Sequence, residues 1–511
     1  IADFLEANRE KDYKLLTTPE GFNKIKEAMQ TVDIDMYTEC FILFDECEKL
    51  VQDVHYRDSI REPMNDFFRF QNKALISATP IVPDSRFDGF MRVLIQPDYV
   101  YRQKLKLITT NNVLETLQEV IEAKRGTVCI FCNSIDSIDS FYRLIPELSN
   151  ACTFCSEDGQ YKLWKGNRRK KSMMITELER YNFFTSRFYS AVDILCKNPP
   201  HVIFVSDLYG AAQSVIDPAT EAIQIIGRFR GGVNSVTHIA SIRPELECMS
   251  SSEIDHWIQG ASTIFNGWKA QLARTTNIGE RTLLQEAIGE NSYLPYLDEN
   301  GKPDSFLIAN FYEKEQVKRL YTSADLLHLA YEQTGYFVFS HEERLMPVSD
   351  NERMAIQHRL AKKKRAELIV RKLEEMEKMS KATDKKIQKR YQRMLMNLIT
   401  STADRYIYDC FCRFGAEFVR EADYNENKLR TALNVSSEHT IKKSGQMRTY
   451  IQRAFPVGAE ISVQEAKSML RQVYKKMGLN TGRGITTKEL EQYAEIENSR
   501  NREARMIKIL K

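Results

Sequence analysis

Three carboxylates follow a short apolar run near the start of the chain. Residues 41–44 read Phe-Ile-Leu-Phe, and Asp45, Glu46 and Glu48 come directly after them. An apolar run bounded by charge predicts a strand buried on both faces of a parallel sheet, with its carboxyl end at the ligand crevice. Adjacent acids there suit nucleotide hydrolysis: Asp45 would hold Mg²⁺, and Glu46 would orient or deprotonate the attacking water. The alternative interpretation is a charged strand end at the surface.

Two later segments carry other groups that this chemistry needs. The first is an apolar run, Leu75-Ile76, that ends in the hydroxyls of Ser77 and Thr79. The second, residues 224–230, places two guanidinium groups just after a glycine, and a guanidinium stabilises charge on a transferred phosphoryl group. The side chains of interest in it are Gln224, Gly227, Arg228 and Arg230.

In this order the segments resemble motifs II, III and VI of superfamily 2 helicases, the group that contains the DEAD and DEAH boxes. Three more segments resemble motifs Ib, IV and V of that group: Thr18-Pro19-Glu20, residues 130–134 and residues 184–193. The resemblance covers roughly residues 10–245. It comes closest to DNA helicases of bacteriophages and mobile elements, especially the type related to viral origin-binding helicases.

The resemblance implies an ATP-dependent DNA helicase or translocase that acts in phage or mobile-element DNA replication, in the cytoplasm of a bacterial host. ATP and Mg²⁺ would be its cofactors, and its partner would be single-stranded or forked DNA. Motifs II and III are shared with RNA helicases, so RNA is an alternative. By this resemblance Asp45, Glu46, Gln224, Arg228 and Arg230 are catalytic, Asp45 and Glu46 are the metal-binding residues, and Ser77, Thr79, Asp193 and Gly227 contact the nucleotide. The strand-binding residues would be Thr18, Pro19, Glu20, Asn133, Ser134, Thr185 and Ser186.

The chain departs from the family pattern in three places. No segment reads Gly-x-x-x-x-Gly-Lys followed by Ser or Thr, the loop that cradles phosphates, and Gly301-Lys302 is followed by Pro303. We therefore expect a fragment that lacks its first βα units and is itself inactive. The alternative is a nucleic-acid-binding or assembly factor whose helicase core is vestigial. In motif VI, Arg230 comes one residue early, and in motif V, Ala191 stands where a glycine is usual.

The pattern of elements predicts an α/β chain with tandem RecA-like parallel-sheet lobes, followed by a mainly helical C-terminal region. We expect an incomplete first lobe over residues 1–95 and a second lobe over residues 96–245. In the second lobe, strands are predicted at Val128–Phe131, Met173–Ile175, His201–Val205 and His238–Ala240. A mainly helical accessory region with basic helices is expected over residues 246–435, and a small helical module over residues 436–511.

The helical region contains a basic run, since residues 359–393 hold fourteen Lys or Arg against five Asp or Glu. Its densest part is Lys362, Lys363, Lys364 and Arg365. This cluster is a candidate phosphate-binding surface, because neutralising phosphates releases counterions. The alternative is a solvated helix face with internal ion pairs.

In the small module, Ser462-x-x-Glu465 predicts a helix start and Gly478 predicts its end. The module would be either a helix-turn-helix that contacts DNA or a docking site for replication proteins.

Composition limits the function without identifying it. The 511 residues are 42% hydrophobic and 28% charged, with a net charge of +3, which is ordinary for a globular protein. No apolar stretch approaches the roughly 18 residues needed to span a bilayer, so we expect no membrane partner. The spacing of Cys129, Cys132, Cys152 and Cys155 is that of a zinc site. Because positions i and i+3 of a strand face opposite sides, we expect reduced thiols instead.

Overall fold

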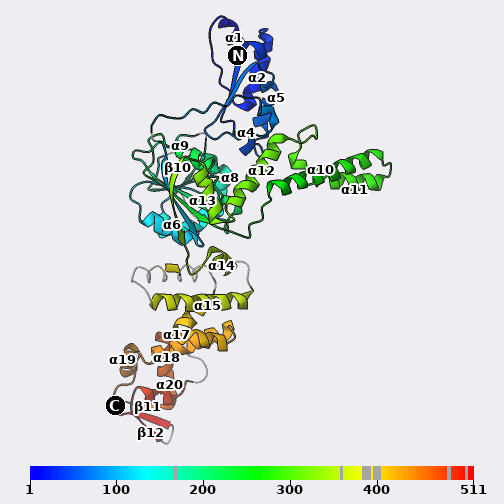
Figure 1. Ribbon diagram of the computed structural model, residues 1–511. Helices are drawn as coiled ribbons and strands as arrows, with labels where there is room; N and C mark the ends of the chain where they lie inside the picture. Colours follow the sequence, from blue (N-terminus) through cyan, green and yellow to red (C-terminus); the bar gives the residue numbers. More distant parts are fainter. Residues whose placement is uncertain are drawn as a thin grey trace. The chain divides into compact units, whose positions relative to one another are not determined.

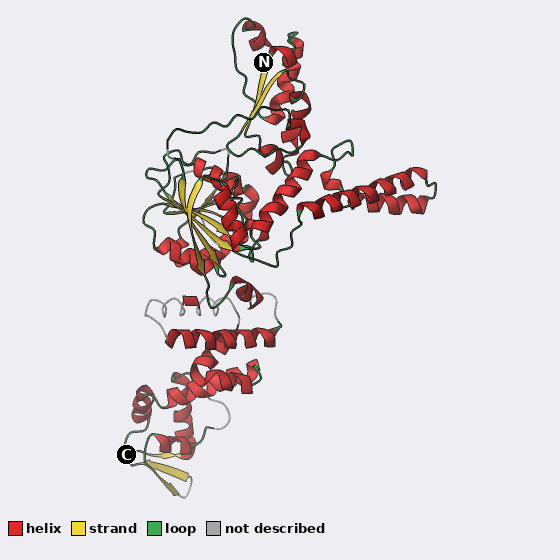
Figure 2. Ribbon diagram, viewed as in Figure 1, coloured by secondary structure: helices red, strands yellow, loops and turns green. Residues whose placement is uncertain are grey.

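The computed structural model describes residues 1–99, 101–164, 170–175, 177–190, 192–356, 361–381, 393–394, 404–479, 485–500 and 505–510. The chain divides into two compact units, Ile1–Met354 and Ala355–Lys511. The first unit is α/β and is built around a large parallel sheet, whereas the second is mainly helical (Figures 1 and 2).

A two-stranded parallel sheet, called here the small sheet, lies within residues 1–95. Strand β1 (Phe41–Asp45) pairs along its whole length with β2 (Asn72–Ile76). The strand expected before the acids is therefore confirmed, and its parallel partner is the strand that leads to Ser77. The prediction that this strand is buried on both faces was wrong, since Phe41 and Leu43 are 63% and 54% exposed. Ile42 and Phe44 point to the packed helices, and in the described chain nothing of similar extent covers the other face.

Short helices and turns occupy the rest of the small-sheet region. They are α1 (Ala2–Ala7), α2 (Phe22–Thr31), α3 (Met36–Glu39), α4 (Lys49–Gln52) and α5 (Met64–Phe67), with the 3-10 turns η1 (Pro19–Gly21), η2 (Asp58–Arg61) and η3 (Ser85–Phe87). Helix α4 is the important one for function, because it begins directly after the three carboxylates.

Eight strands form the large sheet, in the order β10-β3-β9-β8-β4-β7-β5-β6, and each neighbouring pair is parallel. The strands are β3 (Gln103–Thr110), β4 (Val128–Phe131), β5 (Cys152–Phe154), β6 (Lys170–Ser172), β7 (Tyr181–Phe184), β8 (His201–Ser206), β9 (Ser235–Ser241) and β10 (Phe337–Arg344). The predicted parallel sheet is thus confirmed. The expected strands at 128–131, 201–205 and 238–240 are present, the last inside β9.

The prediction of a strand at Met173–Ile175 was wrong. Strand β6 ends at Ser172, whose hydroxyl accepts the backbone N–H of Met174 at 3.1 Å and donates to the carbonyl of the same residue. This side-chain turn competes with strand pairing for the backbone groups, so the apolar residues that follow lie in a loop.

Helices cover the large sheet and its edges: α6 (Val113–Glu122), α7 (Ile135–Leu144), α8 (Glu157–Trp164), α9 (Glu221–Gly227), α12 (Ser305–Leu320) and α13 (Ala324–Gln333). Helices α10 (Ser251–Arg274) and α11 (Ile278–Gly289) instead pack against each other and project away from the sheet (Figure 1). The remaining elements are α14 (Asp350–Met354) and the turns η4 (Pro146–Leu148), η5 (Ser186–Phe188), η6 (Ala212–Ser214) and η7 (Leu294–Tyr296). Alternate residues of the central strands enter two separate cores, one on each face. Burial on both faces is typical of parallel sheets.

The expected end of the sheet region at residue 245 is too early. Strand β10 comes almost a hundred residues later and pairs with β3 over eight residues, Phe337 opposite Gln103 and Arg344 opposite Thr110. Its return to the sheet depends on pairing between distant segments, which local periodicity does not reveal. Residues 305–354 therefore belong to the first unit rather than to a separate accessory region.

Helix α12 joins the small sheet to the large one (Figure 1). At its start, Phe306 and Leu307 are buried in the small-sheet core, and Asn310 Nδ2 donates to the carbonyl of Val51 at 2.8 Å. At its end, Tyr321 is fully buried in the large-sheet core and donates to the carbonyl of Ile216 at 2.7 Å. One helix thus fixes both cores relative to each other within the first unit.

The second unit contains α15 (Lys362–Lys381), α17 (Arg405–Glu421), α18 (Glu426–Lys442), α19 (Gly445–Ala454), α20 (Val463–Lys476) and the turn η9 (Thr487–Gln492). The caps expected for α20 are confirmed: Ser462 accepts the N–H of Glu465, and Gly478 has a φ of +69°. The module at 436–511 is not purely helical as expected. Strands β11 (Glu460–Ser462), β12 (Ile496–Arg500) and β13 (Arg505–Ile509) form an antiparallel sheet in the order β11-β13-β12. They are short and polar, so they carry little strand signal.

Candidate functional site

The three carboxylates occupy the turn between β1 and α4, and their environments differ. Asp45 is exposed at the carboxyl end of β1, and its Oδ1 accepts the backbone N–H of Glu46 at 2.9 Å. Glu46 has a φ of +52°, a left-handed conformation that is uncommon for a residue with a side chain. Glu48 precedes α4 and is completely buried. Left-handed backbone such as that at Glu46 is strained for a residue with a side chain and tends to occur at functional sites.

Glu48 is the residue that joins the acids to the other predicted motifs. Its Oε1 accepts a hydrogen bond from Gln224 Nε2 at 2.5 Å, and the same nitrogen donates to Thr79 Oγ1 at 2.9 Å. Gln224 lies on α9 beside the large sheet, whereas Glu48 and Thr79 follow β1 and β2 of the small sheet. All three side chains are buried. The structure therefore brings together segments that resemble motifs II, III and VI.

Arg228 lies one helical turn beyond Gln224, directly after the end of α9. Its Nε donates to the Gln224 carbonyl at 3.1 Å, and its positive charge lies close enough to Glu46 to lower the pKa of that carboxyl. Burial and the neighbouring charge of Glu48 act more strongly in the opposite direction, so the pKa of Glu46 is raised overall. A carboxyl of raised pKa and a guanidinium whose charge opposes that rise thus belong to the same group of segments.

The second arginine of this segment points elsewhere. Arg230 Nε binds Asp193 Oδ1 at 2.9 Å, and the two side chains are 62% and 50% exposed. Arg230 and Asp193, both expected near a nucleotide, are therefore partners at the surface. Ala191, which replaces the glycine of motif V, lies outside the described residues. Of the two arginines, Arg228 is the one whose charge acts on the pKa of Glu46, because Arg230 is paired with Asp193.

The remaining residues expected near a nucleotide are Ser77 and Gly227. Ser77 Oγ accepts the backbone N–H of Thr79 at 2.8 Å, which fixes the turn that presents Thr79 to Gln224. Gly227 ends α9, and a Cβ built there would have no neighbour within 4 Å. The backbone next to Arg228 is therefore open to a ligand.

The segments that resemble motifs IV and V lie next to each other at the carboxyl edge of the large sheet. Asn133 and Ser134 follow β4, Thr185 and Ser186 follow β7, and the two strands are parallel neighbours. Asn133 is partly exposed and Ser186 is exposed, whereas Thr185 is buried. Ser134 is also buried, since its hydroxyl accepts the N–H of Ser137 as the N-cap of α7. Of the four, Asn133 and Ser186 present polar groups at the surface.

Thr18, Pro19 and Glu20 form the start of η1, beside the small sheet. Glu20 is held by Arg57, whose Nε lies 2.7 Å from its Oε1, and by Ser59 at 3.1 Å. These hydrogen bonds, with that of Arg57 the strongest cause, hold the pKa of Glu20 far below its usual range. This segment makes its described contacts within the small-sheet region, and Thr18 remains exposed.

The basic cluster at 362–365 is at the start of α15 in the second unit, and three of its four cations have carboxylate partners. Lys362 pairs with Glu426, Lys363 pairs with Asp423 at 2.7 Å, and Arg365 pairs with Asp404 at 2.5 Å. Lys364 is exposed. Residues 359–360 and 382–392 of the basic run lie outside the described residues. The ion pairs favour the interpretation of this cluster as a helix face with internal partners.

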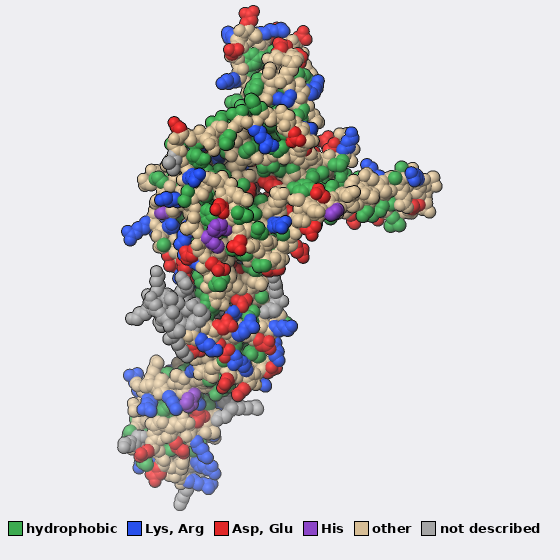
Figure 3. All heavy atoms as spheres, viewed as in Figure 1, with side chains coloured by type: hydrophobic (Ala, Val, Ile, Leu, Met, Phe, Trp, Pro, Cys, Tyr) green, Lys and Arg blue, Asp and Glu red, His purple; other side chains and the backbone are tan. Residues whose placement is uncertain are grey.

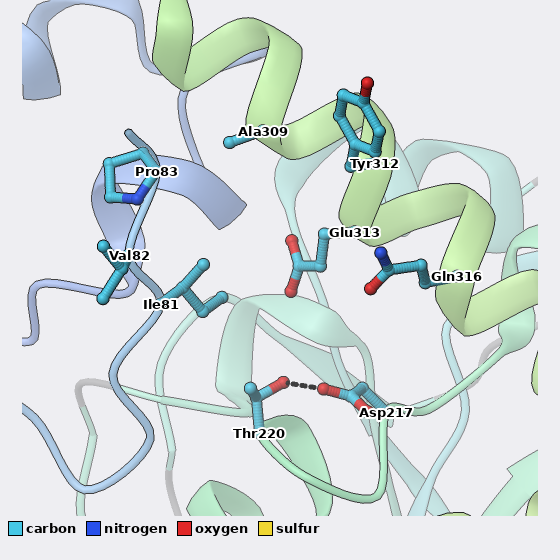
Figure 4. A pocket seen from close by; sticks show the side chains of 9 residues that line it. All are labelled: Ile81, Val82, Pro83, Asp217, Thr220, Ala309, Tyr312, Glu313 and Gln316. Carbon is cyan, nitrogen blue, oxygen red and sulfur yellow. Dashed lines mark hydrogen bonds between the residues drawn. The ribbon is translucent and has the colours of Figure 1, made fainter. Parts of the chain in front are cut away.

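A cavity next to the cleft was not expected from the sequence. It has a volume of about 340 Å³ and lies between residues 81–83, the start of α9 and the side of α12 (Figure 4). Figure 4 shows Glu313 and Gln316 directed toward Thr220, which donates to Asp217. Gln52 Nε2 connects two of the walls, because it donates to Thr220 Oγ1 at 2.9 Å and to Glu313 Oε1 at 3.1 Å.

The acids around this cavity hold their protons more tightly than usual. Burial raises the pKa of Glu313 to about 7, with the charge of Asp217 acting in the same direction. Burial also raises the pKa of Glu221 to about 8. Lys49 and the amide of Gln52 oppose the shift of Glu313. The sequence did not predict that Asp217, Glu221 and Glu313 would lie together, nor that Glu48 would contact Gln224. Only the fold brings α4, α9 and α12 together.

The four cysteines with zinc-like spacing are free and lie on two faces of the large sheet. Cys129 and Cys152 belong to one core, and Cys132 and Cys155 to the other. Within the described parts of the chain, no group of three or more His, Cys, Asp or Glu is arranged to hold a metal ion. Because they divide between the two faces of the sheet, the four thiols do not converge on one point, as a four-cysteine zinc site would require.

No protein-family model matches the chain, and no curated protein shows significant similarity to it. Among the helices that the structure describes, none is long and apolar enough to cross a membrane.

Proposed function

We propose that the chain forms the hydrolytic cleft of an ATP-dependent DNA helicase or translocase, with the small and large sheets as two RecA-like lobes. The observation that supports this most strongly is the contact of Gln224 with Glu48 and Thr79. It unites three segments, 176 and 145 positions apart, in one buried group. Buried polar groups persist when they are mutually satisfied. Because Glu48 and Thr79 come from the small sheet and Gln224 lies beside the large one, this contact suits a site in which hydrolysis depends on the relative position of the two sheets.

The implied groups, Mg²⁺ and ATP, fit one side of this cleft. Mg²⁺ is usually held by one or two carboxylates together with phosphates and water. Asp45 is exposed, and its Oδ1 accepts the N–H of Glu46, so its Oδ2 is the oxygen that would bind Mg²⁺, with Glu46 as the neighbouring carboxylate. Bound there, Mg²⁺ would offset charge on the phosphates. The side that cradles phosphates has no counterpart in the sequence, because the 511 residues contain no phosphate-binding loop.

Glu46 is the proposed general base. Its raised pKa moves the carboxyl toward neutral pH, where a base combines proton affinity with an ionised population. The left-handed backbone at Glu46 directs this side chain from the strand end. Asp45, which is exposed, is the proposed metal ligand. Two adjacent carboxylates thus take different roles because their environments differ.

Arg228 is the proposed source of positive charge for the transferred phosphoryl group. It comes from α9, beside the large sheet, whereas the acids come from the small sheet. The bond from Gln224 to Glu48 holds the first turn of this helix against the acids. Any movement of α9 relative to β1 must therefore change the distance between Arg228 and Glu46, which couples sheet movement to hydrolysis.

A nucleic-acid strand would bind at the carboxyl edge of the large sheet. Asn133 and Ser186 offer an amide and a hydroxyl there, on neighbouring strands. Such groups bind the sugar–phosphate backbone and position a strand without specifying its sequence. DNA of a phage or mobile element, single-stranded or forked, is the proposed partner, and RNA is the alternative.

The missing phosphate-binding loop favours a second candidate, a nucleic-acid-binding factor that does not hydrolyse ATP. The two candidates are separated by the DNA that lies upstream of the codon for Ile1. A reading frame that continues into a Gly-Lys-Ser/Thr loop favours the enzyme. In that longer protein we expect DNA-stimulated ATP hydrolysis, reduced by roughly 10²–10⁴ in Glu46→Gln, the usual range for losing a general base. Equal ATP turnover in the longer protein and in its Glu46→Gln variant would contradict the proposal.

A further inference from the structure

Two cysteines of the large-sheet region contact each other, and the proposed hydrolytic cleft uses neither of them. Cys129 lies on β4, Cys196 lies in the loop that leads into β8, and both pack in the same core. The thiol of Cys129 donates a hydrogen bond to the sulfur of Cys196. Figure 3 shows Lys and Arg side chains interspersed with Asp and Glu over the visible face. Charge of both signs is thus general on that face, whereas two contacting thiols are a local feature with a chemistry of their own.

The two thiols differ in access and in acidity. Cys129 is completely buried, whereas Cys196 is partly exposed. The hydrogen bond from Cys129 lowers the pKa of the Cys196 thiol, and burial opposes this effect. Burial raises the pKa of Cys129, with the same hydrogen bond acting in that direction. An accessible thiol that ionises readily, next to a second thiol, is typical of cysteines that oxidants convert into disulfides.

The position of Cys129 is fixed by the strands on both sides of it. In the parallel register it lies opposite Asn182 on β7 and opposite Val202 on β8. Residues of a strand that is paired on both edges cannot shift without breaking the ladder of backbone hydrogen bonds. Any approach of the two sulfurs must therefore come from the side of Cys196.

The loop of Cys196 is held at two points, one on each side of the cysteine. The N–H of Ile194 donates to the carbonyl of Arg228 at 2.8 Å, and the carbonyl of Pro200 accepts the N–H of Asn234 at 2.8 Å. Within the described chain, the residues between these two points make no backbone-to-backbone hydrogen bond. A disulfide needs its sulfurs about 2 Å apart, and this part of the loop can supply the movement.

The same loop contacts the segment that follows α9. Besides the bond from Ile194 to the Arg228 carbonyl, Asp193 is paired with Arg230 at 2.9 Å. A covalent bond from Cys196 to β4 would therefore tether a loop that binds next to both arginines. It would also limit how far this loop can separate from the sheet.

We propose that Cys129 and Cys196 form a reversible disulfide that ties the loop of residues 192–199 to β4. This redox-controlled link uses no group of the hydrolytic cleft, so it goes beyond the proposed function. In compartments that keep thiols reduced, such bonds are transient and serve catalysis or redox sensing. Any effect on hydrolysis would pass through Ile194 to Arg228, and that consequence alone rests on the proposed function.

The oxidant class that suits an accessible thiolate is a peroxide. The Cys196 sulfur attacks one oxygen of hydrogen peroxide, the O–O bond breaks, and the hydroxide that leaves becomes water with the proton that Cys196 lost. This step gives a sulfenic acid. The Cys129 sulfur then attacks the Cys196 sulfur, the S–O bond breaks, and the departing hydroxide takes the Cys129 proton. Two thiols thus lose two electrons, the peroxide is reduced to two waters, and a dithiol reductant reverses the reaction.

The test treats the full chain with hydrogen peroxide, without nucleotide, and analyses its peptides by mass spectrometry. We expect a cross-linked pair of peptides that contain Cys129 and Cys196. The protein should lose two of its ten thiols and recover them with dithiothreitol. Cys196→Ser, at a partly exposed position that tolerates serine, should form no such cross-link. Cys248→Ser changes another partly exposed cysteine, serves as the control and should form the cross-link as the wild type does.

Two further measurements test the order of the steps and the tether. In Cys129→Ala, oxidation should stop at the sulfenic acid of Cys196, which should bind roughly tenfold more dimedone than in the wild type. In hydrogen exchange, the Ile194 amide should exchange roughly threefold more slowly in the cross-linked protein, and peroxide should not slow it in Cys196→Ser. The proposal is overturned if peroxide is consumed without a bond between Cys129 and Cys196, if dimedone labels both proteins equally, or if cross-linking leaves the Ile194 exchange unchanged. None of these measurements requires ATP, so their outcome is independent of the proposed hydrolysis.

Discussion

The Nε2 atom of Gln224 lies 2.5 Å from Oε1 of Glu48, and the two residues are 176 positions apart in the sequence. Glu48 is completely buried, and its second oxygen, Oε2, has no hydrogen-bond partner among the described residues. A buried carboxyl is costly unless it is hydrogen-bonded. The amide of Gln224 therefore stabilises an otherwise unfavourable group, and it does so only while α9 and the β1–α4 turn stay together.

This relationship predicts energetic coupling between the two side chains. In a double-mutant cycle with Gln224→Ala and Glu48→Ala, the free energies of unfolding should deviate from additivity by about 0.5–3 kcal/mol, the range for contacting residues. Denaturant titration of the four proteins gives this value. The exposed pair Asp193 and Arg230 is the control, and its coupling should not exceed about 1 kcal/mol. Additive effects at Gln224 and Glu48 would show that the buried contact does not form.

The left-handed backbone at Glu46 makes a second prediction. At a φ of +52° a Cβ is unfavourable by roughly 1–2 kcal/mol, and glycine avoids this cost. Glu46→Gly should therefore be more stable than Glu46→Ala by about 1 kcal/mol in thermal or denaturant unfolding. At Asp45, inside β1, the order should reverse, because glycine weakens a strand. Greater stability of the alanine variant at position 46 would be incompatible with this turn.

The third prediction concerns pH. The pKa of Glu313 is raised to about 7 by burial, with Asp217 adding to the shift and Gln52, Lys49 and Lys314 opposing it. A raised carboxyl pKa means that the folded protein binds the proton more tightly than the unfolded chain. Its contribution to stability is complete below the ordinary pKa near 4.5 and is lost as the pH rises through about 7.

Glu313→Gln should remove this part of the pH dependence. Glutamine keeps an oxygen for the bond from Gln52 and carries no charge, so the variant should match the wild type near pH 4.5 and exceed its stability at pH 8. Melting temperatures across this range measure the difference. Glu332→Gln, at an exposed position of α13, serves as the control and should leave the pH profile unchanged. A profile that Glu313→Gln does not alter would mean that the pKa of Glu313 is the same in the folded and the unfolded protein.

The strands that sequence predicted well are those with nearly continuous apolar residues. Val128–Phe131 and His201–Val205 are buried on both faces in the middle of the large sheet, and such strands carry their own signal. Strand β1 was found for the same reason, although its exposed face was not foreseen. Strand β10, which ends in Ser-His-Glu-Glu-Arg, lies at the sheet edge and reads as polar, so only its pairing with β3 identifies it.

The sequence predicted several residues of the site, but it predicted only some of the contacts between them. Motif order pointed to Asp45, Gln224 and Arg228, but spacing could not show that Glu48 would be the buried partner of Gln224. That depends on the start of α4, which turns Glu48 inward. The cavity beside Glu313 could not be foreseen, because α12 begins 78 residues after the end of α9. Contacts between distant elements are a property of the fold rather than of local pattern.

The most direct test of the central claim compares Arg228→Ala with Arg230→Ala in a longer version of the chain that includes a Gly-Lys-Ser/Thr phosphate-binding loop. The claim is that the acids of the small sheet and Arg228 on α9 form one hydrolytic site. Arg228 acts on the pKa of Glu46, whereas Arg230 is bound to Asp193 at the surface. DNA-stimulated ATP turnover should fall by about 10³ or more in Arg228→Ala, the range for a transition-state arginine, and only slightly in Arg230→Ala. Equal and mild losses in the two variants would contradict the account.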